Sequence, residues 1–239
     1  MAAGTAAATA VEVVDLAVTP LRELNQRLHD LARGVDGPRS WRVLNPNGAH
    51  AVACGLDAEI EVEIEGHVGY YCAGMNKLAT VRVHGNAGPG LAENIMSGRV
   101  VVDGSASQYA AATGRGGLVV IAGDASSRCG ISMKGADIVV RGDVGHMSAF
   151  MAQRGRLVVC GDAGDALGDS LYEARLYVRG DVASLGADCV EKDLRDEHVA
   201  ELGELLAEAW VDDVRPEEFR RYGSARRLYN FHVDHAGAY

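Results

Sequence analysis

The chain has 239 residues and a formal net charge of −10; 48% of the residues are apolar, 5% are aromatic and 30 are glycine. This length is sufficient for one large domain with a sizeable core. The acidic balance argues against a nucleic-acid partner and against an anionic membrane surface, because both require a basic footprint.

The chain begins with an Ala/Thr-rich segment, MAAGTAAATAVEVV, which has neither the basic n-region nor the continuous apolar h-region of a secretory signal. We expect residues 1–13 to be disordered. No apolar run approaches the roughly 18 residues of a membrane span. The 5 cysteines are odd in number and have no CxxC spacing, which is typical of a reduced, cytoplasmic protein.

Residues 14–50 are predicted to form an N-terminal cap built around one helix in the segment TPLRELNQRLHDLARG. Thr19 is the expected N-cap and Pro20 the first helical residue, and Gly34 is expected to end the helix. Leucines recur on one face of this helix at Leu21, Leu24, Leu28 and Leu31.

Residues 51–190 contain an internal repeat of 19 residues. Seven consecutive positions at this spacing are all glycine: Gly66, Gly85, Gly104, Gly123, Gly142, Gly161 and Gly180. The residues two and four before each glycine are aliphatic, as in a strand with one buried face. Small apolar residues lie two positions after the glycine, and polar residues directly after it suit an exposed corner.

This pattern predicts an all-β fold, a right-handed parallel β-helix of about seven 19-residue coils. Equivalent residues would stack about 4.8 Å apart. The tetrapeptide RGDV occurs twice, at 141–144 and 179–182, because 38 residues are two periods; an adhesion motif is not needed to explain it. At the corners we expect a positive φ, for example at Gly123, since a tight corner favours glycine.

Residues 191–239 are predicted to form a C-terminal helix followed by a partner-binding tail. In EKDLRDEHVAELGELLAEAW, one helical face carries Leu194, His198, Leu202, Leu205 and Ala209. The tail that follows is basic and aromatic in its middle. We expect it to reach onto a catalytic partner; folding back onto its own chain is the alternative.

No catalytic, cofactor-binding or metal-binding residue is predicted on this chain. His67, His84 and His146 occupy different phases of the repeat, so they do not converge on one ion. The Gly-Asp pairs lack the nonapeptide spacing of calcium-binding repeats, and the Gly-x-x-Gly steps do not open a helix as a dinucleotide fingerprint does. Cys72 and Cys129 share a phase but lie three coils apart, about 14 Å, too far for a disulfide.

A methionine stripe follows one side of the predicted cylinder, and we expect it to fill the core, with an adaptable docking face as the alternative. Candidate interface residues come instead from two inserts, GYYCAGMNK and GHMSAFMAQR, and from the tail, because interfaces favour aromatic, Met and Arg residues. These candidates are Tyr70, Tyr71, Met75, Met147, Phe150, Met151, Phe219, Tyr222, Arg226, Tyr229 and Phe231.

The glycine-phased coils resemble the GXGXG β-helix domain at the C-terminus of the glutamate synthase large subunit. The chain is more similar still to the stand-alone small subunit of glutamate synthase-like complexes of the N-methylglutamate synthase type. The segments that carry this resemblance include TPLRELNQRLHDL, EGHVGYYCAGMNKLATV, GLAENIMSGRV, CGISMKGADIVVRGDVGHMSAFMAQRG, LGDSLYEARLYVRGDV, LGADCVEKD and YGSARRLYNF. It runs from about residue 14 to residue 235 and covers the inserts as well as the coils.

The resemblance implies a non-catalytic scaffold subunit of a cytoplasmic hetero-oligomer in glutamate biosynthesis and nitrogen metabolism. One implied partner is a class II glutamine amidotransferase, and the other is an FMN and iron–sulfur subunit; no cofactor is expected on this chain. Two alternatives remain open: a scaffold like the β-helix subunit of formylmethanofuran dehydrogenase, and an independent β-helix protein with its own small-molecule site. The amine acceptor, the electron donor and the stoichiometry do not follow from the sequence.

Overall fold

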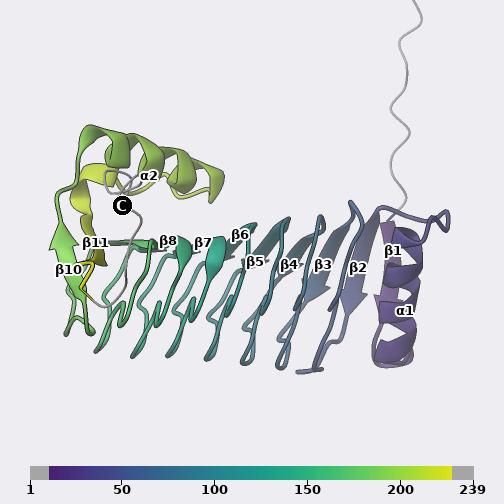
Figure 1. Cartoon of the computed structure of the whole chain (residues 1–239). Coiled ribbons are helices and arrows are strands. Elements are labelled where there is room, and N and C mark those ends of the chain that lie inside the picture. Colours follow the sequence, from purple (N-terminus) through teal and green to yellow (C-terminus); the bar gives the residue numbers. More distant parts are fainter. Residues whose placement is uncertain (1–10, 228–239) are drawn as a thin grey trace, which may run out of the picture.

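The computed structural model describes residues 11–227 and shows a parallel β-helix, as the repeat predicted (Figure 1). A single 11-stranded sheet runs along its whole length in the order β1-β2-β3-β4-β5-β6-β7-β8-β9-β11-β10. The strands before the repeat are β1 (Val11–Asp15) and β2 (Ser40–Leu44). Those within it are β3 (Glu61–Glu65), β4 (Thr80–Val83), β5 (Arg99–Val102), β6 (Leu118–Ile121), β7 (Lys134–Val140), β8 (Arg154–Val159) and β9 (Arg175–Val178).

The register between coils follows the 19-residue period. Val62 pairs with Val81, Val81 with Val100 and Val100 with Val119, all in parallel. These side chains are buried inside the coils. A second column of small residues, bridged between coils from Val68 through Ala87 to Val182, lines the side of each coil that follows the corner glycine. The core is therefore a set of stacked columns in which each side chain packs on its equivalents one coil away.

Glycine is required at the corners because the backbones of neighbouring coils approach each other closely there. The prediction of a positive φ at the corner glycines is wrong for six of the seven. Only Gly66 has a positive φ, at +132°. A Cβ on Gly123 would lie 3.0 Å from both the carbonyl carbon and the oxygen of Gly104. The same contact repeats along the corner because, from Gly104 to Gly180, the N–H of each corner glycine donates to the corner glycine carbonyl of the preceding coil, as Gly123 does to Gly104 at 2.9 Å.

The polar residue after each corner glycine bonds to the next coil. The Oδ1 of Asp124 accepts the N–H of Asp143 at 2.9 Å, and the Oδ1 of Asp143 accepts the N–H of Asp162 at 2.7 Å. The pattern continues from Asp162 to Asp181 at 2.7 Å. The corner aspartates thus form a column of hydrogen bonds between successive coils, and these bonds hold the coils in register.

The third side of each coil has an unusual backbone. Tyr71, Ala73 and Met75 have φ values of 62°, 51° and 55°, and the equivalent three residues of the next five coils also have positive φ. We call residues 70–78 and their equivalents the left-handed wall. Its N–H groups bond to the neighbouring coils: Tyr71 donates to Pro89 at 2.8 Å and Ala73 to Val52 at 3.0 Å. These bonds offset the cost of the left-handed conformation, about 1–2 kcal/mol per residue.

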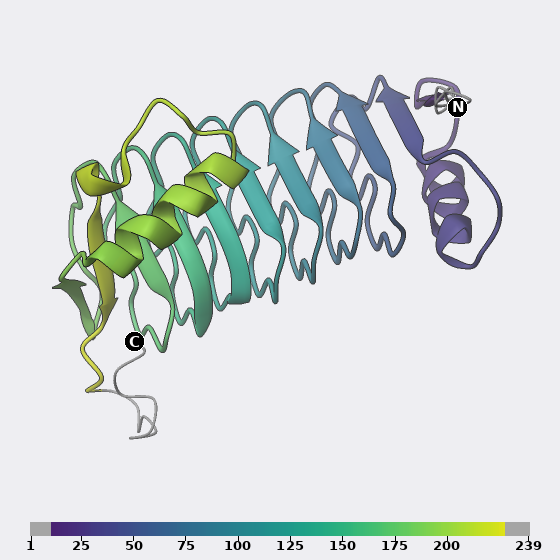
Figure 2. The same cartoon turned by 90° about the horizontal axis from the view of Figure 1, so that it is seen from above.

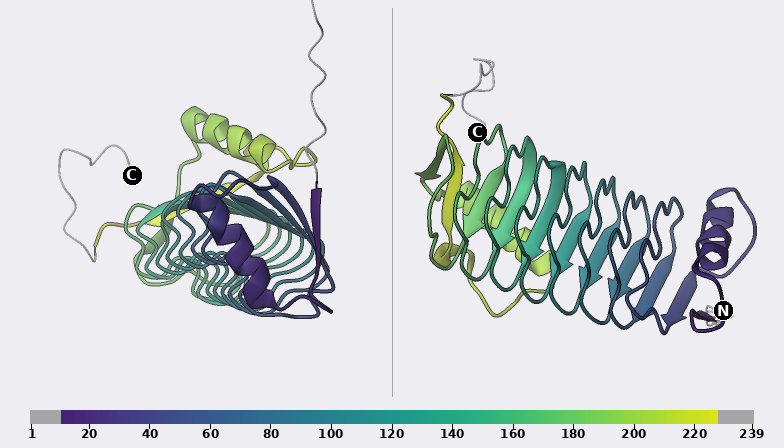
Figure 3. Two further views of the ribbon diagram at one scale, coloured as in Figure 1. Left: turned by 90° about the vertical axis from the view of Figure 1, so that its right-hand side faces the viewer. Right: turned by 90° about the horizontal axis from the view of Figure 1, so that it is seen from below.

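The N-terminal end of the cylinder is closed by α1 (Leu21–Ala32), which lies across the open coil (Figure 3, left). Leu24, Leu28 and Leu31 are buried there, as the periodicity predicted. The predicted N-cap is wrong, because the capping position is Pro20 and no side chain caps the helix. Gly34 follows the helix with a φ of +82°.

The sheet also begins earlier than residue 51. β2 pairs in parallel with β3, and β1 pairs in parallel with β2. Residues 11–13, expected to be disordered, form the start of β1. The alternation in SWRVL was too short to be recognised as a coil without the corner glycine that marks the others.

The C-terminal helix α2 (Asp196–Glu208) lies along the outer face of the sheet over its C-terminal half (Figures 1 and 2). Outward-facing side chains of the strands beneath it are apolar and, together with α2, form a second core. They are Val101, Val120, Val139, Val158 and Tyr177. Towards the N-terminal end of the cylinder, the equivalent outward positions are Arg82 and Glu63, and no helix covers them (Figure 2).

The chain after α2 folds back onto its own sheet. A short 3-10 helix (Pro216–Glu218) leads into β11 (Arg220–Ser224), which lies antiparallel between β9 and β10 (Cys189–Lys192). The expected reach of this segment onto a partner is therefore wrong as far as residue 224. Strand pairing on both edges satisfies its backbone groups, and this is why the tail segment has a fixed place.

Candidate functional site

The outer face of β3, β4 and β5 carries a cluster of His84, Glu63 and Asp103. The Nδ1 of His84 hydrogen-bonds the Oδ2 of Asp103 at 2.7 Å, and its Nε2 hydrogen-bonds Glu63. Arg82 also donates to Asp103, at 2.8 Å. No motif in the sequence predicts this set; the only signal is that Glu63, His84 and Asp103 stand near equivalent positions of successive coils.

Two carboxylates decide the charge of this histidine. Partial burial by itself lowers the pKa of His84, but the hydrogen bonds that its ring makes to the carboxylates of Glu63 and Asp103 raise the pKa above its ordinary value. Both ring nitrogens are occupied by carboxylates, so the ring acts as an imidazolium that links three coils. It offers no free nitrogen to a metal or to a substrate.

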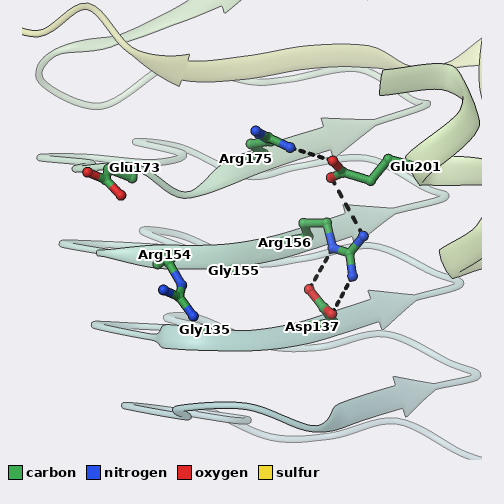
Figure 4. A pocket seen from close by; sticks show the side chains of 8 residues that line it. All are labelled: Gly135, Asp137, Arg154, Gly155, Arg156, Glu173, Arg175 and Glu201. Carbon is green, nitrogen blue, oxygen red and sulfur yellow. Dashed lines mark hydrogen bonds and ion pairs between the residues drawn. The ribbon is translucent and has the colours of Figure 1, made fainter. Parts of the chain in front are cut away.

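A second charged cluster joins α2 to the sheet (Figure 4). Arg156 donates to both oxygens of Asp137, at 2.7 and 2.5 Å, and its guanidinium lies 3.6 Å from Glu201 on α2. Arg175 also pairs with Glu201. The hydrogen bonds that Arg156 donates to Asp137 raise the pKa of Arg156, although burial opposes this.

An open cavity of about 330 Å³ lies beside this cluster. Its lining includes Arg154 and Glu173 (Figure 4). The charges of Asp137, Arg156 and Glu201 are satisfied by one another, so the cluster is an arrangement that fastens the helix to coils. These three paired charges leave little electrostatic attraction of their own for a small ligand. Arg154, which also lines the cavity, makes no ion pair within the described residues.

The structure separates the predicted interface residues into two groups. On the left-handed wall and the corner before it, the residues of the two inserts reach the surface: Tyr70, Met75 and Met151 are 52%, 41% and 45% exposed. Tyr71, Met147 and Phe150 are half-buried on the same wall.

The tail residues behave differently. Phe219 is 3% exposed in the core under α2, and Tyr222 is 2% exposed in the core of the coils. Their assignment as partner contacts is wrong, because their own chain buries them. Arg226 is half-buried, and Tyr229 and Phe231 lie outside the described residues.

The methionine stripe is mainly a surface feature, contrary to the expected core role. Met133 is fully buried, but Met75, Met96 and Met151 are 41%, 43% and 45% exposed. The middle left-handed position of each wall segment, such as Ala73, is buried in the core, whereas the last one carries the exposed side chains of Met75 and Met151. The alternation of an ordinary strand does not predict this arrangement.

Four of the five cysteines are buried thiols, and Cys54 is half-buried. Desolvation raises the pKa of Cys72, Cys129 and Cys189 to about 12, and that of Cys160 to about 11. A thiol with such a pKa is unreactive at neutral pH. Among the residues that the structure describes, no group of three or more His, Cys, Asp or Glu side chains has the geometry of a metal site.

No helix in the described part of the chain is long and apolar enough to cross a membrane. No protein-family profile matches the chain. One similar protein is Protein GlxC of Rhizobium meliloti (strain 1021), which is 67% identical over 227 residues, covering 95% of this chain and 99% of that protein. The chain belongs to the GlxC family. The GlxC match is almost full length, so it takes in the coils, the left-handed wall and both ends of the cylinder.

Proposed function

We propose that this GlxC-family chain is the non-catalytic scaffold subunit of a cytoplasmic, heteromeric glutamate synthase-like complex. Its partners would be a class II glutamine amidotransferase subunit and a subunit that carries FMN and an iron–sulfur cluster. N-methylglutamate synthase is one complex of this type. The similarity of the inserts and both ends of the chain to the stand-alone small subunit supports this choice of complex.

The observation that carries the scaffold role is where the ionisable side chains form their bonds. His84 links three neighbouring strands, Arg156 links two coils to α2, and the corner aspartates link each coil to the next. In an active site, such ionisable side chains would face the substrate. In this chain they bond to one another and hold the cylinder together. The result is a rod with a fixed register, suited to holding other subunits at a set separation.

A second observation agrees with this role. Two of the inserts that the resemblance covers, GYYCAGMNK and GHMSAFMAQR, place Met75 and Met151 on the surface of the same wall. Exposed methionine and aromatic side chains are enriched at protein–protein interfaces.

The test is to purify the chain alone and after co-expression with the amidotransferase and flavin subunits encoded in the same genome. We expect the isolated chain to bind no FMN and to release no ammonia from glutamine. The co-expressed proteins should purify as one complex with glutamine-dependent oxidoreductase activity. A stoichiometric flavin or a glutaminase activity on the isolated chain would overturn the scaffold role. Co-purification of a molybdenum- or tungsten-pterin subunit would favour the formylmethanofuran dehydrogenase alternative.

A further inference from the structure

The left-handed wall gathers exposed apolar side chains on one side of the cylinder. Of the 11 large hydrophobic residues that are exposed in the described part of the chain, five belong to this wall, including all the exposed methionines. They are Tyr70, Met75, Leu78, Met96 and Met151. Half-buried Tyr109, Ile131, Met147 and Phe150 continue the apolar surface between them.

Along one edge of this wall, in line with Met96, runs a column of positive charge. Arg115, Lys134 and Arg154 stand at equivalent positions of three successive coils, and we call them the basic corner. Lys134 and Arg154 are register partners in adjacent strands. Coils lie about 4.8 Å apart, so the three cations repel one another unless an anion lies nearby.

These cations make no ion pair or side-chain hydrogen bond within residues 11–227, and neither does Arg128 on the left-handed wall. The outer sheet face differs, since Arg82, Arg141 and Arg156 each pair with an aspartate at 2.8, 2.6 and 2.5 Å. Carboxylates are plentiful, with 33 acidic against 23 basic residues. Four cations without an ion pair in the described residues therefore lie on or beside the apolar wall.

We propose that the left-handed wall and the basic corner together form the docking surface for a partner subunit whose contact face has an apolar centre and an acidic rim. The proposal rests on the scaffold function above and names the surface and the chemistry of the partner. Methionine side chains adapt their shape to an apolar centre, and the four unpaired cations complement an acidic rim. The acidic residue Glu173, one coil beyond Arg154, marks the end of the basic corner.

The test compares two pairs of substitutions at this surface with a matched control pair. Lys134→Glu with Arg154→Glu reverses the charge of the basic corner, where both side chains are exposed. Met75→Asn with Met151→Asn removes two apolar anchors; asparagine tolerates a positive φ, and the wall already has Asn94 at an equivalent position with a φ of 59°. The control is Arg22→Glu with Arg39→Glu, two exposed arginines of the N-terminal region that also make no ion pair within the described residues.

Affinity for each purified partner subunit is measured at low and high salt. We expect wild type and the control to bind equally, and each wall pair to bind one partner roughly tenfold more weakly or worse. The charge-reversed pair should also lose the salt dependence seen in wild type. Circular dichroism melts check that all variants are folded.

The experiment distinguishes a failure of the proposed function from a failure of the proposed docking surface. If wild type binds neither partner, the proposed function is wrong. If wild type binds but both wall pairs bind equally well, only the docking surface is wrong. If light scattering shows that the isolated chain dimerises and that the wall substitutions abolish the dimer, the occupant is a second copy of the chain and the proposal is overturned.

Discussion

Substitution of one corner glycine by alanine tests the central physical feature of the coils, their close approach at the corner. In Gly142→Ala the new Cβ would lie 2.0 Å from the Oδ1 of Asp124, 2.9 Å from the carbonyl oxygen of Gly123 and 3.0 Å from its carbon. The φ of Gly142 lies outside the left-handed region, so backbone strain at this residue does not contribute.

The expected cost has two parts. The Asp124 carboxylate must move and give up the N–H of Asp143, which it accepts at 2.9 Å; such a bond contributes about 0.5–1.5 kcal/mol. The contact with the Gly123 carbonyl is relieved only by moving backbone, and overpacking of this kind costs about 1–3 kcal/mol. The free energy of unfolding should therefore fall by about 2–4 kcal/mol and Tm by roughly 5–15 °C.

The loss of stability is measured by thermal unfolding monitored with circular dichroism, and substitutions of two other glycines serve as controls. Gly34→Ala places its Cβ in open space at a φ of +82° and should cost only the left-handed strain, about 1–2 kcal/mol. Gly203→Ala, within α2, meets only the Cγ of Pro216 at 3.4 Å and should stabilise the protein by up to about 1 kcal/mol. In an Asp124→Ala background, Gly142→Ala should cost about 1 kcal/mol less. A Gly142→Ala protein with the Tm of wild type would refute the close-approach explanation.

Further outcomes concern the ion cluster, the tail and the thiols. Because the pKa of His84 is raised in the folded state, the stability that this residue contributes is complete below its unfolded-state pKa of 6.5 and is lost as the pH rises through its folded-state pKa. The difference in Tm between wild type and His84→Gln should therefore shrink as the pH is raised above 6.5. A difference that grows with pH would contradict the cluster. Phe219→Ala should lower the free energy of unfolding, measured by urea denaturation, by about 3–5 kcal/mol, because the ring of Phe219 fills the core beneath α2. A loss below about 0.5 kcal/mol, as for a surface residue, would show that this part of the tail does not pack there. With a thiol reagent near neutral pH, the half-buried Cys54 should react first and Cys72 and Cys129, whose pKa is about 12, only on unfolding; five rapidly reacting thiols in the native protein would contradict their burial.

The repeat was readable from sequence because two independent signals share one period. Glycines such as Gly104 and Gly123 mark the corner, and alternating aliphatic residues such as Val100 and Val102 mark the strand before it. Stacking then follows, since a strand with one buried face needs equivalent strands beside it. β2 has the strand pattern alone, without the corner glycine, and was for that reason assigned to the cap.

The left-handed wall could not be read in the same way. Its positive φ values occur at Tyr71, Met75 and Met147 as well as at Gly90 and Gly130, so residue type does not report the backbone conformation. The inter-coil hydrogen bonds impose that conformation, and they form only after the coils have stacked. The gap-filling behaviour of methionine predicts a core position, whereas the backbone conformation of the wall places Met75 and Met151 at the surface.

The sequence does not predict the burial of the tail or the ion cluster for a related reason: both depend on contacts between residues that are distant in sequence. Phe219 and Tyr222 are buried because β11 inserts between β9 and β10, an antiparallel arrangement that the 19-residue period gives no hint of. His84 meets Glu63 and Asp103 from neighbouring strands, at offsets of 21 and 19 residues. Only the second offset equals the period.

Native mass spectrometry of the chain co-expressed with its amidotransferase and flavin subunits tests the central claim, that this protein is a scaffold holding catalytic subunits. We predict one complex that contains all three proteins, with FMN retained on the flavin subunit and none on this chain. Removal of this chain should abolish the association of the other two. A two-protein complex of amidotransferase and flavin subunit that forms equally well without this chain would contradict the claim.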